Sequence, residues 1–342
     1  MSGLLVLEDG TAFRGESVGA PGTAVGEAVF TTGMSGYQEV VTDPSFSGQI
    51  VCFTAPMVGN YGVAGHRSES SRAHARGVLM REARGPAWTR WLASRGVVAL
   101  TGVDTRSLTL HLRAEGAMAA ALVSDGDSAK AHAALLAEPR MAGRALVAGV
   151  SASSPYRYCE AGGPRIAVVD YGAKRSLLRL LASAGASVSV FPHDVSASTL
   201  LGYDGVLLSS GPGDPEPLVR ETAMVRELLG RVPLFGVCLG HQLLALATGL
   251  STFKLRFGHR GVNHPVLERA SGRVLVTSQN HGFAVSGAAA SHESLYDGTV
   301  EGLCFPELRA ASVQFHPEAG PGPSDGRPIL ERFVAEVRAA AA

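Results

Sequence analysis

One cysteine lies in a setting that suits nucleophilic chemistry. Cys238 is the centre of the sequence GVCLG (residues 236–240), which follows a short apolar run and precedes a longer apolar segment. A strand, a sharp turn and a helix in this order are typical of a nucleophile elbow, here with cysteine in the usual place of serine. The positive end of the helix favours a thiolate, and the N–H of Leu239 is left free to bind a developing oxyanion. Cys238 is therefore a candidate nucleophile.

Two other interpretations of Cys238 are open. Most free cysteines are small buried apolar side chains with no chemical role. Cys238 and His241 are also three residues apart on one expected helix, a spacing that two metal ligands can have, but no second ligand pair accompanies them. The sequence therefore predicts no metal site.

A thiol nucleophile needs a general base, and histidine suits that role near neutral pH. Of the 11 histidines, His316 follows a short apolar run directly, in the sequence ASVQFHPE. Residues two apart share a face of an extended segment, so Glu318 is expected to reach and orient His316. The alternative is that HPE is a turn with a solvated glutamate.

Two further segments could complete such a site. The loop SSGPGDPEP contains Gly211 and Gly213, whose backbone N–H groups can approach a ligand closely and could supply a second oxyanion donor. In SQNHGFAV (residues 278–285), Gly282 and Phe283 could line a small pocket. Either segment could instead be an ordinary turn or loop.

After residue 164, strand-like segments alternate with helical segments, and these elements must hold the candidate residues in place. Short apolar runs at 165–170, 187–191, 205–210 and 232–237 alternate with helical patterns at 174–185 and 216–229. This pattern predicts a doubly wound α/β domain with a mostly parallel sheet, over residues 165–342. Ligands bind such sheets at the carboxyl ends of the strands, where the candidate residues lie.

A different domain is expected before it. Residues 1–150 begin with two strand-like runs around Asp9 and Gly10, a turn pair that suits a hairpin. A helix that Asp104 could cap and Gly116 could end follows later, so a mixed α+β domain is predicted. Residues 151–164, rich in Ser, Gly and Pro, are the expected linker.

The amino-acid composition limits the classes of molecule that the protein is expected to bind. With 30 basic and 30 acidic residues and no basic block, nucleic acid is a poor candidate, and a small polar molecule or a protein fits better. Four scattered cysteines favour a reducing compartment, and no leader or membrane-length apolar run is seen, so a cytoplasmic protein is expected.

Together the four segments resemble, in this order, the class I glutamine amidotransferase domain with its cysteine-histidine-glutamate triad. The sequences TTGMSGYQEVVTDPSFSGQIVCFTAPMVGNYG and GVDTRSLTLHLR in the first domain are similar to the amino-terminal domain of carbamoyl-phosphate synthetase small subunits. The resemblance covers nearly the whole chain. It departs from the family at residues 83–120, where a segment is shortened, and this departure bears on contacts with a large subunit.

The resemblance implies a role for each matching residue. Cys238 would attack the side-chain amide of glutamine, with His316 as base and Glu318 as its orienter. Backbone N–H groups of Gly211 and Leu239 would form the oxyanion hole. The glutamine pocket would be lined by Ser47 from the first domain and by Gly213, Gln242, Asn280, Gly282 and Phe283 from the second.

The resemblance also implies a partner. The chain has no GxxxxGK[ST] loop and no further domain for nucleotide binding, so ATP and magnesium are expected on a large synthetase subunit and no cofactor is expected in this chain. That subunit would receive ammonia and make carbamoyl phosphate for pyrimidine and arginine synthesis. The alternatives are a catalytically idle regulatory or binding paralogue, and a glutaminase that donates ammonia to a different synthase.

Overall fold

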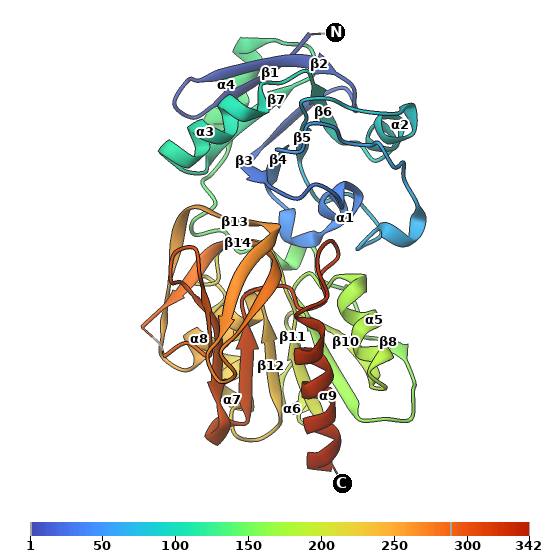
Figure 1. The fold of residues 1–342 in the computed structure, drawn as a ribbon, viewed down its shortest axis with the longest axis vertical. Coiled ribbons are helices and arrows are strands. Elements are labelled where there is room, and N and C mark those ends of the chain that lie inside the picture. The colour runs from blue at the N-terminus through green and yellow to red at the C-terminus, as the bar shows by residue number, and fades with distance from the viewer. Residues whose placement is uncertain (1, 288, 342) are drawn as a thin grey trace. The chain divides into compact units, whose positions relative to one another are not determined.

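The computed structural model describes residues 2–287 and 289–341, and the chain divides into two compact units (Figure 1). Unit 1 comprises Met1–Arg144 together with Arg256–Gly261, and unit 2 comprises Ala145–Leu255 and Val262–Ala342. A six-residue stretch from the second half of the chain therefore belongs to unit 1. The domain boundaries expected from composition stay a prediction, and within the expected linker Tyr156–Cys159 form a strand, β8.

Unit 1 is built around a closed barrel. Its strand order is β1-β2-β6-β5-β4-β3-β7. The strands are β1 (Ser2–Leu7), β2 (Ala12–Ser17), β3 (Thr23–Thr31), β4 (Gln49–Phe53), β5 (Gly77–Leu79), β6 (Val98–Thr101) and β7 (Met118–Val123). The predicted hairpin is present as the antiparallel pair β1 and β2, and Gly10 in its turn has a φ of 87°. Glycine allows that conformation at no steric cost.

Helices cover this barrel, as a mixed α+β domain requires. They are α1 (Tyr37–Thr42), α2 (Pro86–Ser94), α3 (Thr105–Glu115) and α4 (Ser128–Ala137). The predicted capping of α3 is confirmed, because the Asp104 side chain accepts from the Ser107 N–H at 3.0 Å and Gly116 follows the last turn with a φ of 104°. The shortened region at residues 83–120 keeps regular structure, with α2, β6, α3 and the first half of β7.

Unit 2 contains a ten-stranded sheet among the described residues, in the order β14-β13-β15-β16-β17-β12-β11-β9-β10-β8. Its strands besides β8 are β9 (Arg165–Asp170), β10 (Ser187–Pro192), β11 (Gly205–Leu208), β12 (Leu234–Val237), β13 (Ser251–Glu268), β14 (Arg273–Ser286), β15 (His292–Ser294), β16 (Val300–Phe305) and β17 (Ala310–Val313). Strands β10, β9, β11, β12 and β17 are parallel neighbours. The predicted doubly wound fold is confirmed.

Successive side chains of β9 point to opposite faces of the sheet, and each face has its own hydrophobic core. Ile166 and Val168 pack with α5 (Arg175–Ser183) and α9 (Arg327–Ala341) on one face. Ala167 and Val169 pack with α6 (Ala197–Leu200), α7 (Val219–Leu228) and α8 (Leu239–Ala247) on the other. A strand buried on both faces reads as a continuous apolar run, which is why RIAVVD was recognisable from the sequence.

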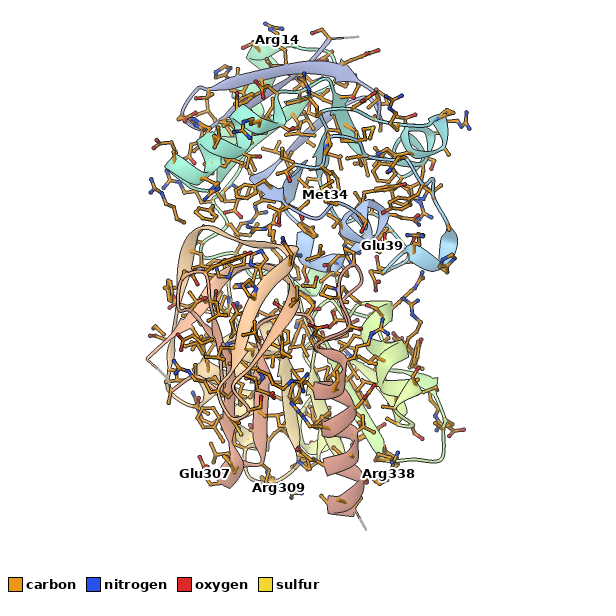
Figure 2. All side chains as sticks on the ribbon, viewed as in Figure 1. Arg14, Met34, Glu39, Glu307, Arg309 and Arg338 are labelled. Carbon is orange, nitrogen blue, oxygen red and sulfur yellow. The ribbon has the colours of Figure 1, made fainter. Side chains whose placement is uncertain are left out.

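The carboxyl ends of the parallel strands share one edge of the sheet. In Figure 2 the labelled Glu307 and Arg309 lie at the lower edge of unit 2, just before β17 begins. Strand β17 leads away from that edge, toward His316, and β12 runs parallel to it toward Cys238. The candidate nucleophile and the candidate base therefore lie at the same edge of the sheet.

The antiparallel part of the sheet was not expected from the sequence. Strand β16 pairs with β17, β15 with β16, and β13 with β15, all antiparallel. Residues 278–285, which could be read as a loop, lie inside β14. No helix in the described part of the chain combines the length and the apolar character that a membrane crossing requires.

Candidate active site

Cys238 stands at the turn between β12 and α8, with an unusual backbone. Its φ of 53° and ψ of −101° lie in a region that side chains other than glycine rarely adopt. The flanking glycines permit this turn, because a Cβ on Gly236 would come 2.5 Å from the Gly240 carbonyl oxygen. A Cβ on Gly240 would come 2.3 Å from the carbonyl oxygen of Leu208. The two glycines of GVCLG are therefore required by close backbone packing.

The two residues whose N–H groups are expected to bind an oxyanion are neighbours in the fold. Leu239 is the first residue of α8, and a Cβ on Gly211 would come 2.8 Å from the Leu239 Cδ2 atom. Within residues 2–287 and 289–341, the N–H groups of Gly211 and Leu239 donate no hydrogen bond. Two unused donors beside a nucleophile can stabilise a developing negative charge.

His316 and Glu318 meet in a turn. The Nδ1 atom of His316 lies 2.8 Å from Oε1 of Glu318, and both side chains are fully buried. The predicted reason for this contact, an extended backbone, is wrong: the Ala319 N–H donates to the His316 carbonyl at 3.1 Å, which closes a turn. The His316 N–H donates to the Ser278 carbonyl at 2.9 Å, so β14 also holds the imidazole in place.

A lysine that the sequence analysis missed completes this group. Lys174 precedes α5 at the carboxyl end of β9, and its ammonium lies 2.8 Å from Oε1 of Glu318. It also donates to the carbonyls of Ala319 at 2.5 Å and Gly320 at 3.3 Å. The side chain of Lys174 is 2% exposed. Its only signal in the sequence was its place at the start of the predicted helix 174–185, separated by three residues from the end of the predicted strand 165–170.

These buried charges set the protonation of the pair. Burial acts to raise the pKa of Glu318, but Lys174 and then His316 outweigh it and hold that pKa at about 2. Burial and Lys174 act to lower the pKa of His316, but Glu318 and a side-chain interaction with Cys238 outweigh them and raise that pKa to about 10. The arrangement favours a carboxylate beside an imidazolium.

The thiol of Cys238 has two possible partners. Its Sγ atom lies 3.6 Å from the carbonyl oxygen of Asn280, to which a thiol can donate. The Nε2 atom of His316 is buried and has no hydrogen bond at normal distance among the described residues, although Cys238 is near enough to raise the pKa of the ring. A thiolate cannot donate to Asn280, so on ionisation Cys238 would pair with the imidazolium.

Several of the expected pocket residues surround the nucleophile. Gln242 lies one turn along α8 from Cys238, and its Nε2 donates to the Phe283 carbonyl at 2.9 Å and to Gln314 Oε1 at 3.1 Å. Asn280 and Phe283 are buried, and Gly282 lies between these two residues in β14. Gln314, fully buried beside Gln242, was not predicted.

Two expected pocket residues lie outside this cluster. Gly213 is two residues beyond Gly211 in the loop after β11, with a φ of 96° and a bridge to Ala145. Ser47 belongs to unit 1, where it follows a short 3-10 helix, η1 (Pro44–Phe46), and bridges to Ala75. The part of Ser47 in binding glutamine stays a prediction.

Comparison with known families and proteins agrees with this geometry. The family model described as the carbamoyl-phosphate synthase small chain, CPSase domain, matches residues 5–122, and the class I glutamine amidotransferase model matches residues 167–336. The chain is 46% identical to a carbamoyl phosphate synthase small chain of Symbiobacterium thermophilum, over 97% of each chain. It is 45% identical to that of Methanopyrus kandleri, over 99% of each.

A solved structure of a glutamine amidotransferase from Thermotoga maritima is 18% identical, with a TM-score of 0.39, and the match covers 52% of this chain and 94% of that one. The two full-length relatives and the two family models are sufficient to assign the family. The chain belongs to the carbamoyl-phosphate synthase small chain family and is a glutamine amidotransferase subunit.

Proposed function

We propose that this chain hydrolyses glutamine with Cys238, His316 and Glu318, and passes the ammonia to a large ATP-using subunit that makes carbamoyl phosphate. The observation that carries the proposal is the buried group of His316, Glu318 and Lys174 beside a cysteine at a nucleophile elbow. Perturbed titratable groups arranged in this way are typical of catalytic sites.

In the first half of the reaction the thiolate of Cys238 attacks the side-chain amide carbon of glutamine. The negative charge that forms on the amide oxygen is stabilised by the N–H groups of Leu239 and Gly211. His316 then gives a proton to the leaving nitrogen, the C–N bond breaks, and ammonia departs. A glutamyl thioester on Cys238 remains.

In the second half water attacks the thioester carbon, and His316 accepts a proton from the water. The same backbone N–H groups stabilise the second oxyanion. The C–S bond breaks, which releases glutamate and restores Cys238. Glu318 keeps the imidazole oriented throughout, and Lys174 keeps Glu318 ionised.

The substrate pocket is proposed to comprise Gln242, Asn280, Phe283, Gly282 and Gly213, with Ser47 contributed by unit 1. The polar groups of Gln242 and Asn280 suit the α-amino and carboxylate groups of glutamine. No cofactor is needed for these steps, because thiol, imidazole and backbone N–H groups supply all the proton transfers and charge stabilisation.

The partner follows from the chemistry and from the relatives' names. Relatives of nearly equal length are named small chains, which supports a large subunit as partner. Carbamoyl phosphate synthesis also consumes ATP, so ATP and magnesium are proposed to bind to that subunit. Released ammonia would pass to it directly.

The decisive experiment replaces Cys238 with serine in the purified chain assembled with its large subunit. Glutamine hydrolysis is expected to fall by at least roughly 10³-fold, whereas an ammonium salt still supports carbamoyl phosphate synthesis. Cys304→Ser is the matched control, because Cys304 is exposed on β16 and should be dispensable. A Cys238→Ser variant with the parental hydrolysis rate would contradict the mechanism.

The same assay separates the two alternative functions. A parental complex that makes carbamoyl phosphate from ammonium but not from glutamine would indicate an idle paralogue. Steady glutamine hydrolysis without carbamoyl phosphate synthesis by any co-purifying large subunit would indicate a different synthase. Either result would contradict the proposed function.

A further inference from the structure

The loop that carries Lys174 to Glu318 turns around one buried carboxylate. Asp170 is the last residue of β9, and residues 171–173 separate it from Lys174, which precedes α5. Asp170 is 8% exposed. Because the ammonium of Lys174 lies 2.8 Å from Oε1 of Glu318, the path of residues 171–173 decides whether that contact forms. The catalytic steps above give Asp170 no part.

The Asp170 carboxylate accepts hydrogen bonds from the backbone of this loop. Its Oδ1 atom accepts from the N–H groups of Gly172 at 2.9 Å and of Ala173 at 2.7 Å. Gly172 has a φ of 135°, a conformation that glycine adopts at no steric cost. Hydrogen bonds to an ionised group are roughly twice as strong as bonds between neutral groups. The turn of the loop therefore depends on the Asp170 side chain.

The other carboxylate oxygen binds a different segment of unit 2. Oδ2 of Asp170 accepts from the Ala152 N–H at 2.8 Å. Ala152 lies before β8, in the part of the chain that follows unit 1 in the sequence. Each oxygen of Asp170 thus binds a separate segment, so a substitution can remove one contact and keep the other.

The start of the loop has its own support. The hydroxyl of Ser209, which is fully buried, accepts from the Tyr171 N–H at 2.9 Å. Asp170 instead holds the two residues directly before Lys174. Loss of the Asp170 carboxylate should therefore move the end of the loop, together with Lys174, and leave the start of the loop in place.

We propose that Asp170 is a positioning residue for the glutaminase site, and that it acts through Lys174 by holding the ammonium against Glu318. Glu318 in turn contacts His316, so a displaced Lys174 would also affect the orientation of the imidazole. In the described part of the chain no hydrogen bond joins Asp170 to the residues proposed to bind glutamine. The effect on glutamine hydrolysis rests on the proposed function, whereas the effect on the position of Lys174 does not.

The kinetic test compares two substitutions of Asp170 in the assembled complex. Asp170→Ala removes both oxygens, and the glutaminase kcat should fall roughly 10- to 100-fold, the effect of a group displaced by about 1 Å. The KM for glutamine should stay within about twofold of the parental KM, because no bond to the substrate is lost. Parental kcat in Asp170→Ala would overturn the proposal.

Asp170→Asn is the conservative substitution. Its amide oxygen can still accept from Gly172 and Ala173, whereas its NH₂ group cannot accept from Ala152. If the bonds to the loop are the ones that matter, this variant should keep a kcat within roughly fivefold of the parental kcat. Equal losses of kcat in Asp170→Asn and Asp170→Ala would overturn the proposal.

A double-mutant cycle with Lys174→Met tests whether Asp170 acts through Lys174. In the Lys174→Met background, Asp170→Ala should change kcat by less than about twofold, because the contact that Asp170 supports is already lost. A merely structural role would instead give losses that multiply in the double variant. Losses that multiply would overturn the proposal.

The same four chains are then unfolded in urea, a measurement that needs no glutaminase activity. The shift of the unfolding midpoint in the double variant should be smaller than the sum of the two single shifts, because the two residues support one contact. Additive shifts would overturn the proposal even if the chain proves to be an inactive paralogue. If Lys174→Met does not fold, the comparison of Asp170→Ala with Asp170→Asn decides.

Asp204→Ala is the matched control. Asp204 also accepts a backbone N–H, that of Arg165 at 2.8 Å, but at the opposite end of β9. The control should have the parental kcat, and its midpoint shift should add to that of Lys174→Met. A loss of kcat in Asp204→Ala equal to the loss in Asp170→Ala would show that support of β9 in general is responsible, and would overturn the proposal.

Discussion

The charge of Lys174 can be tested by Lys174→Met, which keeps an unbranched side chain of nearly the same length but has no ammonium group. The acceptors of that group include Oε1 of Glu318 and the carbonyls of Ala319 and Gly320. After the change, His316 is the only partner that the buried Glu318 carboxylate keeps among residues 2–287 and 289–341. Breaking a buried ion pair on one side costs about 3–5 kcal/mol of unfolding free energy.

The substitution also changes two pKa values in a defined direction. Lys174 lowers the pKa of both Glu318 and His316, so both pKa values should rise in the variant. The pKa of Glu318 in the parental fold is about 2, below the ordinary glutamate pKa of 4.5. Its ionisation therefore stabilises the fold above about pH 4.5, and that stabilisation is lost as the pH falls toward 2. In Lys174→Met this acid dependence should be shallower, and the acid limb of the glutaminase pH profile should move to higher pH.

The assay is urea unfolding followed by far-ultraviolet circular dichroism, with Lys130→Met as control. Lys130 pairs with Asp125 at 2.9 Å, nearly the same distance as the 2.8 Å between Lys174 and Glu318, but both partners are largely exposed. Water screens such a pair, so its loss should leave the unfolding midpoint unchanged. Equal midpoint shifts in the two variants, or an unchanged acid limb in Lys174→Met, would refute the reasoning.

Two further predictions concern the elbow and a buried histidine beside it. Gly240→Ala places a Cβ 2.3 Å from the Leu208 carbonyl oxygen. The resulting displacement of the nucleophile should lower the glutaminase kcat by roughly 10²-fold. In the control Gly65→Ala the new Cβ has no atom within 4 Å, so its kcat should equal the parental kcat. Equal rates in the two variants would show that the elbow tolerates the shift. Burial, and then His292, lower the pKa of His241 to about 3. Because the unfolded chain binds this proton first, the unfolding free energy should fall by up to about 1.4 kcal/mol per pH unit between about pH 6.5 and 3. His241→Gln should remove that contribution, and an unchanged acid slope of stability would contradict the shift.

The doubly wound core and the reactive cysteine could be predicted because their signals are local. The segment around Cys238 carries strand, glycine turn and helix within a few residues, and β9 is a continuous apolar run. The cap and end of α3 were likewise readable from Asp104 and Gly116, because capping involves neighbours in the sequence.

The parts that could not be predicted depend on partners distant in the sequence. Lys174 becomes part of the site only because β9 and the turn after β17 end at the same edge of the sheet. Strand β13 is hard to recognise, because its apolar residues do not alternate regularly over its 18 residues.

The assignment of Arg256–Gly261 to unit 1 limits how this protein can be divided. The Arg260 carbonyl accepts from the Thr32 N–H, the Arg256 carbonyl from the Ala117 N–H, and the Phe257 ring packs on Phe30. A fragment starting at residue 145 would carry this stretch without any of those partners, and the complementary fragment would lack a piece of its own unit. Expression of the amidotransferase half alone should therefore expose an apolar ring and unpaired backbone groups, and such a fragment should aggregate unless the stretch is replaced by a short polar connection.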